Sequence, residues 1–352
     1  MKILGTAIRL CYLNKLMDYI KNNFLILEIG SFMGSSLLTM AEGLYRNNKK
    51  GKIIAVEPFD YFFKNILVDI DEEGRKVEND KIIAEFYKTI SLIKENFDID
   101  IIHIKGYSFE VMQLLKDKSF DLIYIDGDHS YNSVKQDILL SKKLIKEEGI
   151  ICGDDLEFEY EELKQRKINP YEYKNFYAKK INNYRYHPGV TVAVWEEFKK
   201  VKNYYGFWIN KNLDLIPSIK NIPSHLTLYD VVNSYLLTPH KLFENFISPY
   251  TKKVKGYVYP YNTVAKQAVK ENILEVKEFI DSKKRIKNAK RIKNDTIIIT
   301  SFRFLEKILN EIDESNDIYY VHWENLNLYK INKKIFNSFK KENNNVSQCL
   351  NR

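Results

Sequence analysis

The sequence lacks the features of a disulfide scaffold and of a membrane protein. Its 352 residues include only three cysteines, Cys11, Cys152 and Cys349, which are too few for a disulfide framework and have no metal-ligand spacing. No apolar run approaches the ~18 residues that a membrane-spanning helix needs. The N-terminal segment spaces its apolar residues as a helix does and has no small-residue cleavage site, which does not fit a signal peptide. We therefore expect a cytoplasmic protein without a transmembrane segment.

The chain also lacks a strong excess of charge of one sign. Its 55 basic and 47 acidic residues leave a formal net charge of +8, and the lysines are spread along the chain. The densest basic cluster, residues 283–293, could contact nucleic acid or an anionic membrane. No aromatic side chains interleave with it and no nucleic-acid motif accompanies it. We interpret the cluster as a solvated helix or linker and expect no nucleic-acid partner.

Residues 1–212 alternate short apolar runs with helical stretches. Five Ile- and Val-rich runs each end in a glycine or an acid, which is typical of strands buried in a parallel sheet. These predicted strands are residues 25–30, 52–57, 100–105, 121–126 and 149–154. The alternation predicts an α/β fold with a doubly wound, mostly parallel, Rossmann-like sheet. Two more runs, 190–195 and 204–209, are predicted to add a terminal antiparallel hairpin and complete seven strands.

Residues 213–352 do not continue the alternation of strands and helices, so we predict two domains with a boundary at residue 212. A proline-containing stretch at 212–227 is predicted to be a linker or an irregular crossing. The later segments predict a mainly helical region: helices around 228–237, 264–285 and 302–313, and strand-like pieces at 295–300 and 318–323. No internal repeat and no chemical motif is visible there. Its role is not readable from the sequence.

The loop after the first predicted strand indicates a nucleoside site. Gly30 and Gly34 lie where the strand turns into a helix, and glycine there lets a ligand approach the backbone. The helix N-terminus offers free N–H groups to an anion. Glu57 ends the second strand, where a carboxylate can accept both hydroxyls of a ribose. The loop reads G-S-F-M-G and not the complete G-x-G-x-x-G, which favours S-adenosylmethionine over NAD because no pyrophosphate has to be bound.

Acidic residues end the next two strands. Asp126 ends the fourth and Asp154 and Asp155 end the fifth, so they should converge at the carboxyl edge of the sheet. Three carboxylates without a cation would repel one another and raise one another's pKa. A hard divalent ion, most plausibly Mg²⁺, resolves this conflict. His129 follows Asp126 by three residues and can fold over the same edge. Any one of these residues alone is more often a loop or capping residue, but their combination favours a functional site.

Five stretches occur in the order and at the spacing of a known family: EIGSFMGSS, AVEPF, IDGDHSY, GDD and HPGVTVAVWEEF. Through these five stretches, residues 1–212 resemble the class I S-adenosylmethionine-dependent methyltransferases. The resemblance is closest to the metal-dependent O-methyltransferases related to the macrocin and mycinamicin sugar methyltransferases, and more distant to the catechol-type enzymes. A longer, acid-rich insertion at 61–80 and a tyrosine-rich segment with His187 depart from the pattern. The pattern does not extend to residues 213–352.

The resemblance implies a role for each matching residue. His129 would be the general base, and the catechol-type enzymes carry a lysine at that position, which supports proton transfer. The metal ligands would be Asp126, Asp154 and Asp155. The implied cofactor-binding residues are Glu28, Gly30, Gly34, Ser36, Glu57, Ser108 and Asp126. Glu28, Gly30 and Ser36 would line the methionine end, Glu57 would hold the ribose, and Ser108 would contact the adenine.

The sequence is therefore compatible with two functions. The first is an S-adenosylmethionine-dependent, Mg²⁺-dependent O-methyltransferase that acts on a hydroxyl of a sugar or a glycosylated small molecule. The alternative is a nucleotide-binding module without methyl transfer, either NAD-linked or regulatory. The C-terminal region could cover the acceptor, hold a partner or pair two subunits, so a homo-oligomer stays open.

Overall fold

The computed structural model describes residues 7–59, 72–176, 178–181, 184–260, 262–280 and 291–342. The chain divides into two compact units, one from Arg9 to Pro223 and one that begins at Ser224 and also includes Ala7 and Ile8. Most of the basic cluster at 283–293 and much of the acid-rich insertion at 61–80 lie outside the described residues.

The first unit contains a seven-stranded sheet in the order β3-β2-β1-β4-β5-β9-β8. Strands β1 to β5 pair in parallel, β9 pairs antiparallel to β5, and β8 pairs antiparallel to β9. The strands are β1 Phe24–Ile29, β2 Gly51–Val56, β3 Asp100–Ile104, β4 Phe120–Ile125, β5 Ile145–Gly153, β8 Lys202–Tyr204 and β9 Phe207–Ile209. The predicted doubly wound sheet with a terminal antiparallel hairpin is confirmed.

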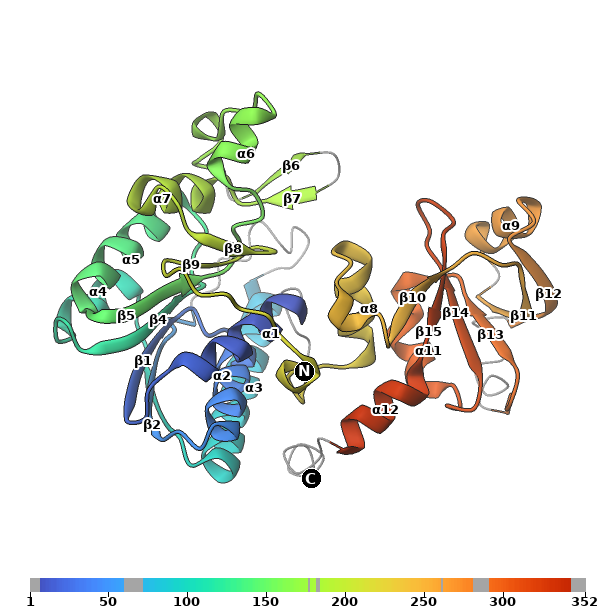
Figure 1. The fold of residues 1–352 in the computed structure, drawn as a ribbon, viewed down its shortest axis with the longest axis horizontal. Coiled ribbons are helices and arrows are strands. Elements are labelled where there is room, and N and C mark those ends of the chain that lie inside the picture. Colours follow the sequence, from blue (N-terminus) through green and yellow to red (C-terminus); the bar gives the residue numbers. More distant parts are fainter. Residues whose placement is uncertain are drawn as a thin grey trace. The chain divides into compact units, whose positions relative to one another are not determined.

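Helices cover both faces of this sheet, with α4, α5 and α7 on one face and α1, α2 and α3 on the other (Figure 1). The helices of this unit are α1 Ala7–Leu16, α2 Ser35–Arg46, α3 Glu72–Phe97, α4 Ser108–Val111, α5 Tyr131–Leu144, α6 Tyr160–Gln165 and α7 Pro188–Phe198. Val134 and Ile138 of α5 join Ile123, Ile151 and Trp208 of the sheet in one buried core. Burial on both faces explains why the strands read as continuous apolar runs and not as alternating ones.

The predicted strand at 190–195 is wrong, because these residues belong to helix α7. Pro188 occupies the first turn of the helix, a position where its missing N–H costs nothing. Val190 to Val194 are all buried, so the run shows no periodicity that would separate a helix from a strand. The hairpin is instead β8–β9, and its turn residues Tyr205 and Gly206 both have positive φ, as tight two-residue hairpin turns require.

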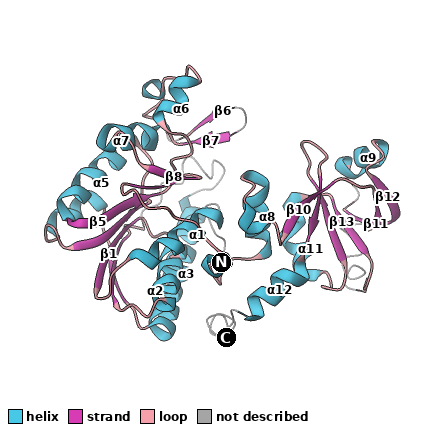
Figure 2. Ribbon diagram, viewed as in Figure 1, coloured by secondary structure: helices cyan, strands magenta, loops and turns pink. Residues whose placement is uncertain are grey.

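The second unit is built around a six-stranded sheet in the order β10-β15-β14-β13-β11-β12 (Figure 2). Strands β11 to β14 pair in parallel, while β15 and β10 add antiparallel edges. The strands are β10 Ile247–Tyr250, β11 Val254–Tyr259, β12 Leu274–Phe279, β13 Thr296–Ile299, β14 Asp317–Val321 and β15 Leu328–Ile331. Among the described residues of this unit, the helices of eight residues or more are α8 Leu228–Leu237, α9 Thr263–Lys270 and α12 Lys333–Glu342, and α11 Leu305–Glu311 is shorter.

The prediction of a mainly helical C-terminal region is therefore wrong. The predicted helix at 264–285 ends at Lys270, and Asn272, with φ of 59°, reverses the chain into edge strand β12. Charged side chains on β12, such as Glu275 and Lys277, give the segment the appearance of a solvated helix face. Charges on an exposed edge strand prevent pairing with other chains. Among the described residues, no helix is long and apolar enough to cross a bilayer.

Candidate active site

The carboxyl ends of β1, β2, β4 and β5 meet at one edge of the first sheet. The strand order reverses between β1 and β4, and ligands of open α/β sheets bind at such a switch point. Glu28 lies near the end of β1, and Glu57, Asp126 and Asp154 directly follow β2, β4 and β5. The parallel register thus brings the predicted residues to the same edge.

The turn between β1 and α2 requires glycine at both predicted positions. Gly30 and Gly34 have φ of 82° and 83°, which L side chains rarely adopt. A Cβ on Gly30 would lie 2.2 Å from the carbonyl oxygen of Asp126, and one on Gly34 would lie 2.9 Å from Cγ2 of Thr89. The turn therefore lies close against the loop after β4 and against helix α3.

Glu57 fixes this glycine turn through its carboxylate. Its Oε2 accepts a hydrogen bond from the backbone N–H of Phe32 at 2.8 Å, and its Oε1 accepts one from Phe59 at 2.9 Å. The side chain is buried. Each carboxylate oxygen can accept a second hydrogen bond, so these contacts leave capacity for a ligand's hydroxyls. His103 lies beside it, with Nε2 3.2 Å from the backbone oxygen of Glu57.

Glu28 is fully buried at the other side of the turn. The hydroxyl of Ser31 donates to its Oε2, and Ser36 also hydrogen-bonds to the carboxyl group. Burial raises the pKa of Glu28 to about 7, with a contribution from Glu57, against the opposing effect of the two serines. Its Oε1 has no hydrogen-bond partner among the described residues. A buried acceptor without a partner is rare in folded proteins and indicates a position for a ligand's donor.

A buried arginine that no sequence pattern singles out pairs with the carboxylates after β5. Nη1 of Arg9, on helix α1, lies 2.8 Å from Oδ1 of Asp154 and 2.8 Å from Oδ1 of Asp155. Nη2 reaches Oε1 of Glu157 at 3.2 Å, and Nε donates to the carbonyl of Tyr205 at 2.7 Å. The guanidinium therefore binds three acidic side chains and one backbone oxygen.

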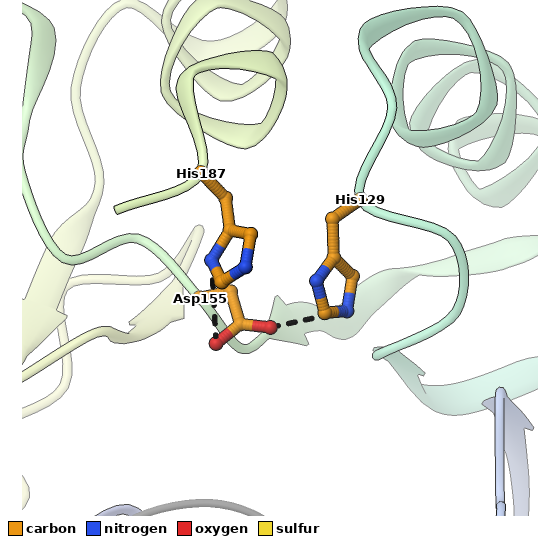
Figure 3. Close-up of side chains that lie close together, drawn as sticks. All are labelled: His129, Asp155 and His187. Atoms are coloured by element: carbon orange, nitrogen blue, oxygen red, sulfur yellow. Dashed lines mark ion pairs between the residues drawn. The ribbon is translucent and has the colours of Figure 1, made fainter. Parts of the chain in front are cut away.

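Two histidines meet Asp155 from the other side (Figure 3). Nε2 of His129 lies 3.1 Å from Oδ2 of Asp155, and Nδ1 of His187 lies 3.8 Å from Oδ1. The two imidazole rings contact each other edge to face, with centroids 4.5 Å apart. Glu157 accepts from the backbone N–H of His187 at 3.1 Å and lies 3.2 Å from its Nδ1. His187 is also the N-cap residue, directly before helix α7.

The surroundings of these groups shift their pKa values in opposite directions. Burial lowers the pKa of His129 below its ordinary value, against the charge of Asp155, while His187 adds to the lowering. Burial alone would raise the pKa of Asp155, but His129, Arg9 and His187 together hold it well below its usual range. Burial raises the pKa of Asp154 to about 7, although Arg9 opposes this. Asp155 is therefore the carboxylate that is most firmly ionised.

Asp126 lies in the least compensated environment of the three predicted metal ligands. Its Oδ2 accepts a hydrogen bond from the hydroxyl of Tyr124 at 3.2 Å. Burial, with the charges of Asp154, Asp155 and Glu28, raises the pKa of Asp126 well above its ordinary value. A carboxyl group in this environment favours its protonated form.

The arrangement fits the predicted Mg²⁺ site poorly. Mg²⁺ prefers oxygen ligands in an octahedron, but the oxygens of Asp154 and Asp155 that face Arg9 already bind a cation. Within the described ranges, the group whose ligand atoms lie close enough to hold a metal, within 4.8 Å of one another, is His129, Asp155 and His187. Two of these ligands are nitrogens, which suit transition metals better than Mg²⁺. The set Asp126, Asp154 and Asp155 stays a prediction.

Ser108, the predicted adenine contact, begins helix α4 and hydrogen-bonds to Asp137 of α5. Burial raises the pKa of Asp137 to about 7, and its Oδ1 has no hydrogen-bond partner in the part of the chain that the structure describes. The contact of Ser108 with a cofactor stays a prediction.

Three residues of the site were missed or left without a role. Arg9 precedes the first strand by more than a dozen residues, and nothing in its local pattern distinguishes it from other basic helix residues. Glu157 follows Asp155 by two residues, and its contacts with Arg9 and His187 depend on the fold. His187 lies in a tyrosine-rich segment, and no sequence spacing indicates its contact with Asp155.

Comparison with known proteins places a recognised domain over these loops. Residues 27–156 match a family model described as a methyltransferase domain. A relative from Acanthamoeba polyphaga mimivirus, the uncharacterized protein R132, is 28% identical over 143 residues, which cover 38% of this chain and 52% of that protein. The chain thus spans about half the length of the curated relative that it matches.

Solved structures resemble the chain only at low similarity. CalS11, a TDP-rhamnose 3'-O-methyltransferase of calicheamicin biosynthesis, is 13% identical with a TM-score of 0.33, and the match covers 59% of this chain and 79% of CalS11. PaMTH1 of Podospora anserina, solved with S-adenosylhomocysteine, is 17% identical with a TM-score of 0.34, and the match covers 56% and 74% of the two chains. Similarity at this level assigns no substrate.

Proposed function

We propose that this chain, which carries a methyltransferase domain at residues 27–156, transfers a methyl group from S-adenosylmethionine to a hydroxyl group of a small acceptor. The observation that carries the proposal is the glycine turn of Gly30 and Gly34, fixed by Glu57 and lying beside the unpartnered Oε1 of Glu28. The turn, a buried acceptor and a second carboxylate are the groups that a nucleoside with an amino-acid tail needs.

Each end of the cofactor has a matching group at this edge of the sheet. The α-ammonium of its methionine part would donate to Oε1 of Glu28, which has no partner among the described residues. The ribose hydroxyls would donate to the remaining lone pairs of Glu57. Ser108 would contact the adenine, as the resemblance implies. S-adenosylmethionine supplies an electrophilic methyl group on a sulfonium when it is bound.

His129 is the general base in this proposal. A lowered pKa keeps its imidazole neutral at physiological pH, so it can accept a proton. With Nε2–H directed to the ionised Asp155, the unprotonated Nδ1 becomes the basic atom. Bound S-adenosylmethionine would supply the methyl group to the acceptor oxygen and leave as the neutral thioether, and the hydroxyl proton would pass to His129. Asp155 holds the ring in orientation and stabilises the imidazolium that forms.

Several finer parts remain predictions from the sequence. A sugar or glycosylated molecule is our preferred acceptor, on the resemblance to sugar methyltransferases. The cytoplasmic location and a possible homo-oligomer also stay predictions. Mg²⁺ is left out of the mechanism, because Arg9 already pairs with Asp154 and Asp155.

Calorimetric titration of the full chain with S-adenosylmethionine, S-adenosylhomocysteine and NAD tests the cofactor. We expect the first two to bind at one site per chain and NAD not to bind. Glu28→Gln should weaken binding about tenfold or more, because a hydrogen bond to a charged group contributes ~1.5–3 kcal/mol. Glu147→Gln, an exposed position on β5, is the matched control and should bind as the wild type does. Saturable binding of NAD alone would favour the nucleotide-binding alternative.

A further inference from the structure

We infer that the guanidinium of Arg9 takes the place of a divalent cation at the end of β5, and that the chain's carboxylates there do not bind Mg²⁺. If the proposed function is correct, methyl transfer by this chain then needs no metal, and that second statement rests on the proposed function. The first statement concerns only the chain's own charges.

The contacts of Arg9 are those of a built-in cation. Its side chain is almost fully buried, and each of its three guanidinium nitrogens has a partner. Nη1 is shared between Asp154 and Asp155 at 2.8 Å each. Guanidinium groups suit such sites because their charge is permanent and their donors form a rigid fork. The position resembles that of a cation bridging two carboxylates.

The backbone around the guanidinium is shaped to admit it. Gly206, in the β8–β9 turn, has φ of 101°, and a Cβ at this position would lie 2.3 Å from Nη2 of Arg9. The turn is held by the side chain of Asn203, which accepts from the N–H of Gly206 at 2.9 Å, and by the N–H of Leu156, which donates to the carbonyl of Gly206 at 3.0 Å. Helix α1, the turn and the loop after β5 together enclose the guanidinium.

The charges leave little attraction for a further cation. Oδ1 of Asp155 faces Arg9, and Oδ2 faces His129, so both oxygens already have partners. Oδ1 of Asp154 accepts from Arg9 and from the backbone N–H of Asp155. A divalent ion placed on these oxygens would lie within a few ångströms of a guanidinium and would be repelled by it.

Arg9 is thus a positioning residue that acts through Asp155. It fixes one oxygen of Asp155, the other oxygen contacts Nε2 of His129, and the imidazole is oriented in turn. A lysine at position 9 would keep the charge but would lose the fork that binds Asp154, Asp155 and Glu157 together.

The experiment measures binding of Mn²⁺, a spectroscopic substitute for Mg²⁺, to the full chain by electron paramagnetic resonance. The variants are Arg9→Ala and Arg9→Lys, with Arg166→Ala as the control, because Arg166 is exposed and pairs with Glu162 away from the site. Wild type, Arg166→Ala and Arg9→Lys should bind Mn²⁺ weakly and alike. Arg9→Ala should bind it at least about tenfold more tightly, because the removed charge frees Asp154 and Asp155. A merely structural role of Arg9 would not create a new metal site.

Three results would overturn the inference. The first is tight, stoichiometric binding of Mn²⁺ by the wild type that is lost in Asp154→Ala. The second is that folded Arg9→Ala binds Mn²⁺ no more tightly than the wild type does. The third is that the wild type retains a divalent metal through purification. If Arg9→Ala does not fold, the wild type and Asp154→Ala decide the question. Calorimetric titration of S-adenosylmethionine in excess chelator separates this inference from the proposed function. Failure to bind the cofactor would refute the function, whereas Mn²⁺ binding would refute the role of Arg9.

Discussion

Glu57→Gln probes the contact that fixes the glycine turn. The glutamine is nearly isosteric, so it creates no cavity, but it has one accepting oxygen where the carboxylate has two. The structure requires two, because the N–H groups of Phe32 and Phe59 each donate to a different oxygen. In the variant, the amide NH₂ must therefore face one of these N–H groups as a second donor.

The expected loss follows from that single mismatch. A buried donor left unsatisfied, where a charged acceptor was present, costs about 1.5–3 kcal/mol. For a domain of this size, ~1 kcal/mol corresponds to roughly 2–4 °C in melting temperature, so the variant should melt about 3–12 °C lower. Affinity for S-adenosylmethionine should fall about tenfold or more, because the turn is loosened and the ribose loses an acceptor.

Thermal unfolding followed by circular dichroism and calorimetric titration of S-adenosylmethionine measure the two effects. Glu147→Gln makes the same chemical change at an exposed site of β5 and should change neither quantity. If Glu57→Gln matches this control in melting temperature and in affinity, the carboxylate neither fixes the turn nor binds the ribose, and the assignment is refuted.

Four further predictions concern the same edge of the sheet. His129→Ala should spare cofactor affinity yet lower kcat by roughly 10²-fold or more, and a loss below tenfold would contradict its role as base. In the wild type, kcat should fall on acidification only below pH 6.5, because the pKa of His129 is lowered. The charge of Asp155 raises this pKa, so Asp155→Asn should move the fall in kcat to still lower pH. Gly30→Ala should abolish cofactor binding or folding, since its Cβ would lie 2.2 Å from the Asp126 carbonyl. A chain ended at Pro223 should still bind the cofactor, and a folded truncation without affinity would contradict the assignment of all cofactor residues to the first unit.

The parallel strands of the first sheet could be predicted because both of their faces are buried, which makes their sequences continuous apolar runs. Helix α7 could not, because burial of Val190 to Val194 on all sides removes the periodicity that identifies a helix. Strand β12 failed for the opposite reason, since an edge strand rich in Glu and Lys has the composition of a solvated helix. The local composition of a segment indicates mainly how buried it is, and it indicates secondary structure only where the two are related.

The candidate site divides in the same way. Glu57, Asp126 and Asp154 could be placed together from the sequence, because parallel strands end at one edge, whereas Glu28 was implied only by the resemblance. The partner of the acidic residues could not, because Arg9 reaches them through tertiary packing of α1 against the loop after β5. Electrostatic reasoning required a cation among the carboxylates, and the structure supplies one from the chain itself.

Methyl transfer itself is the most direct test of the account. The full chain is incubated with S-adenosylmethionine carrying a deuterated methyl group and with fractionated metabolite extracts, and the products are analysed by mass spectrometry. The account predicts a labelled methyl ether, formed together with an equal amount of S-adenosylhomocysteine, in reactions with wild type but not with Gly30→Ala. Saturated binding of S-adenosylmethionine with no labelled product and no S-adenosylhomocysteine from any fraction would contradict it.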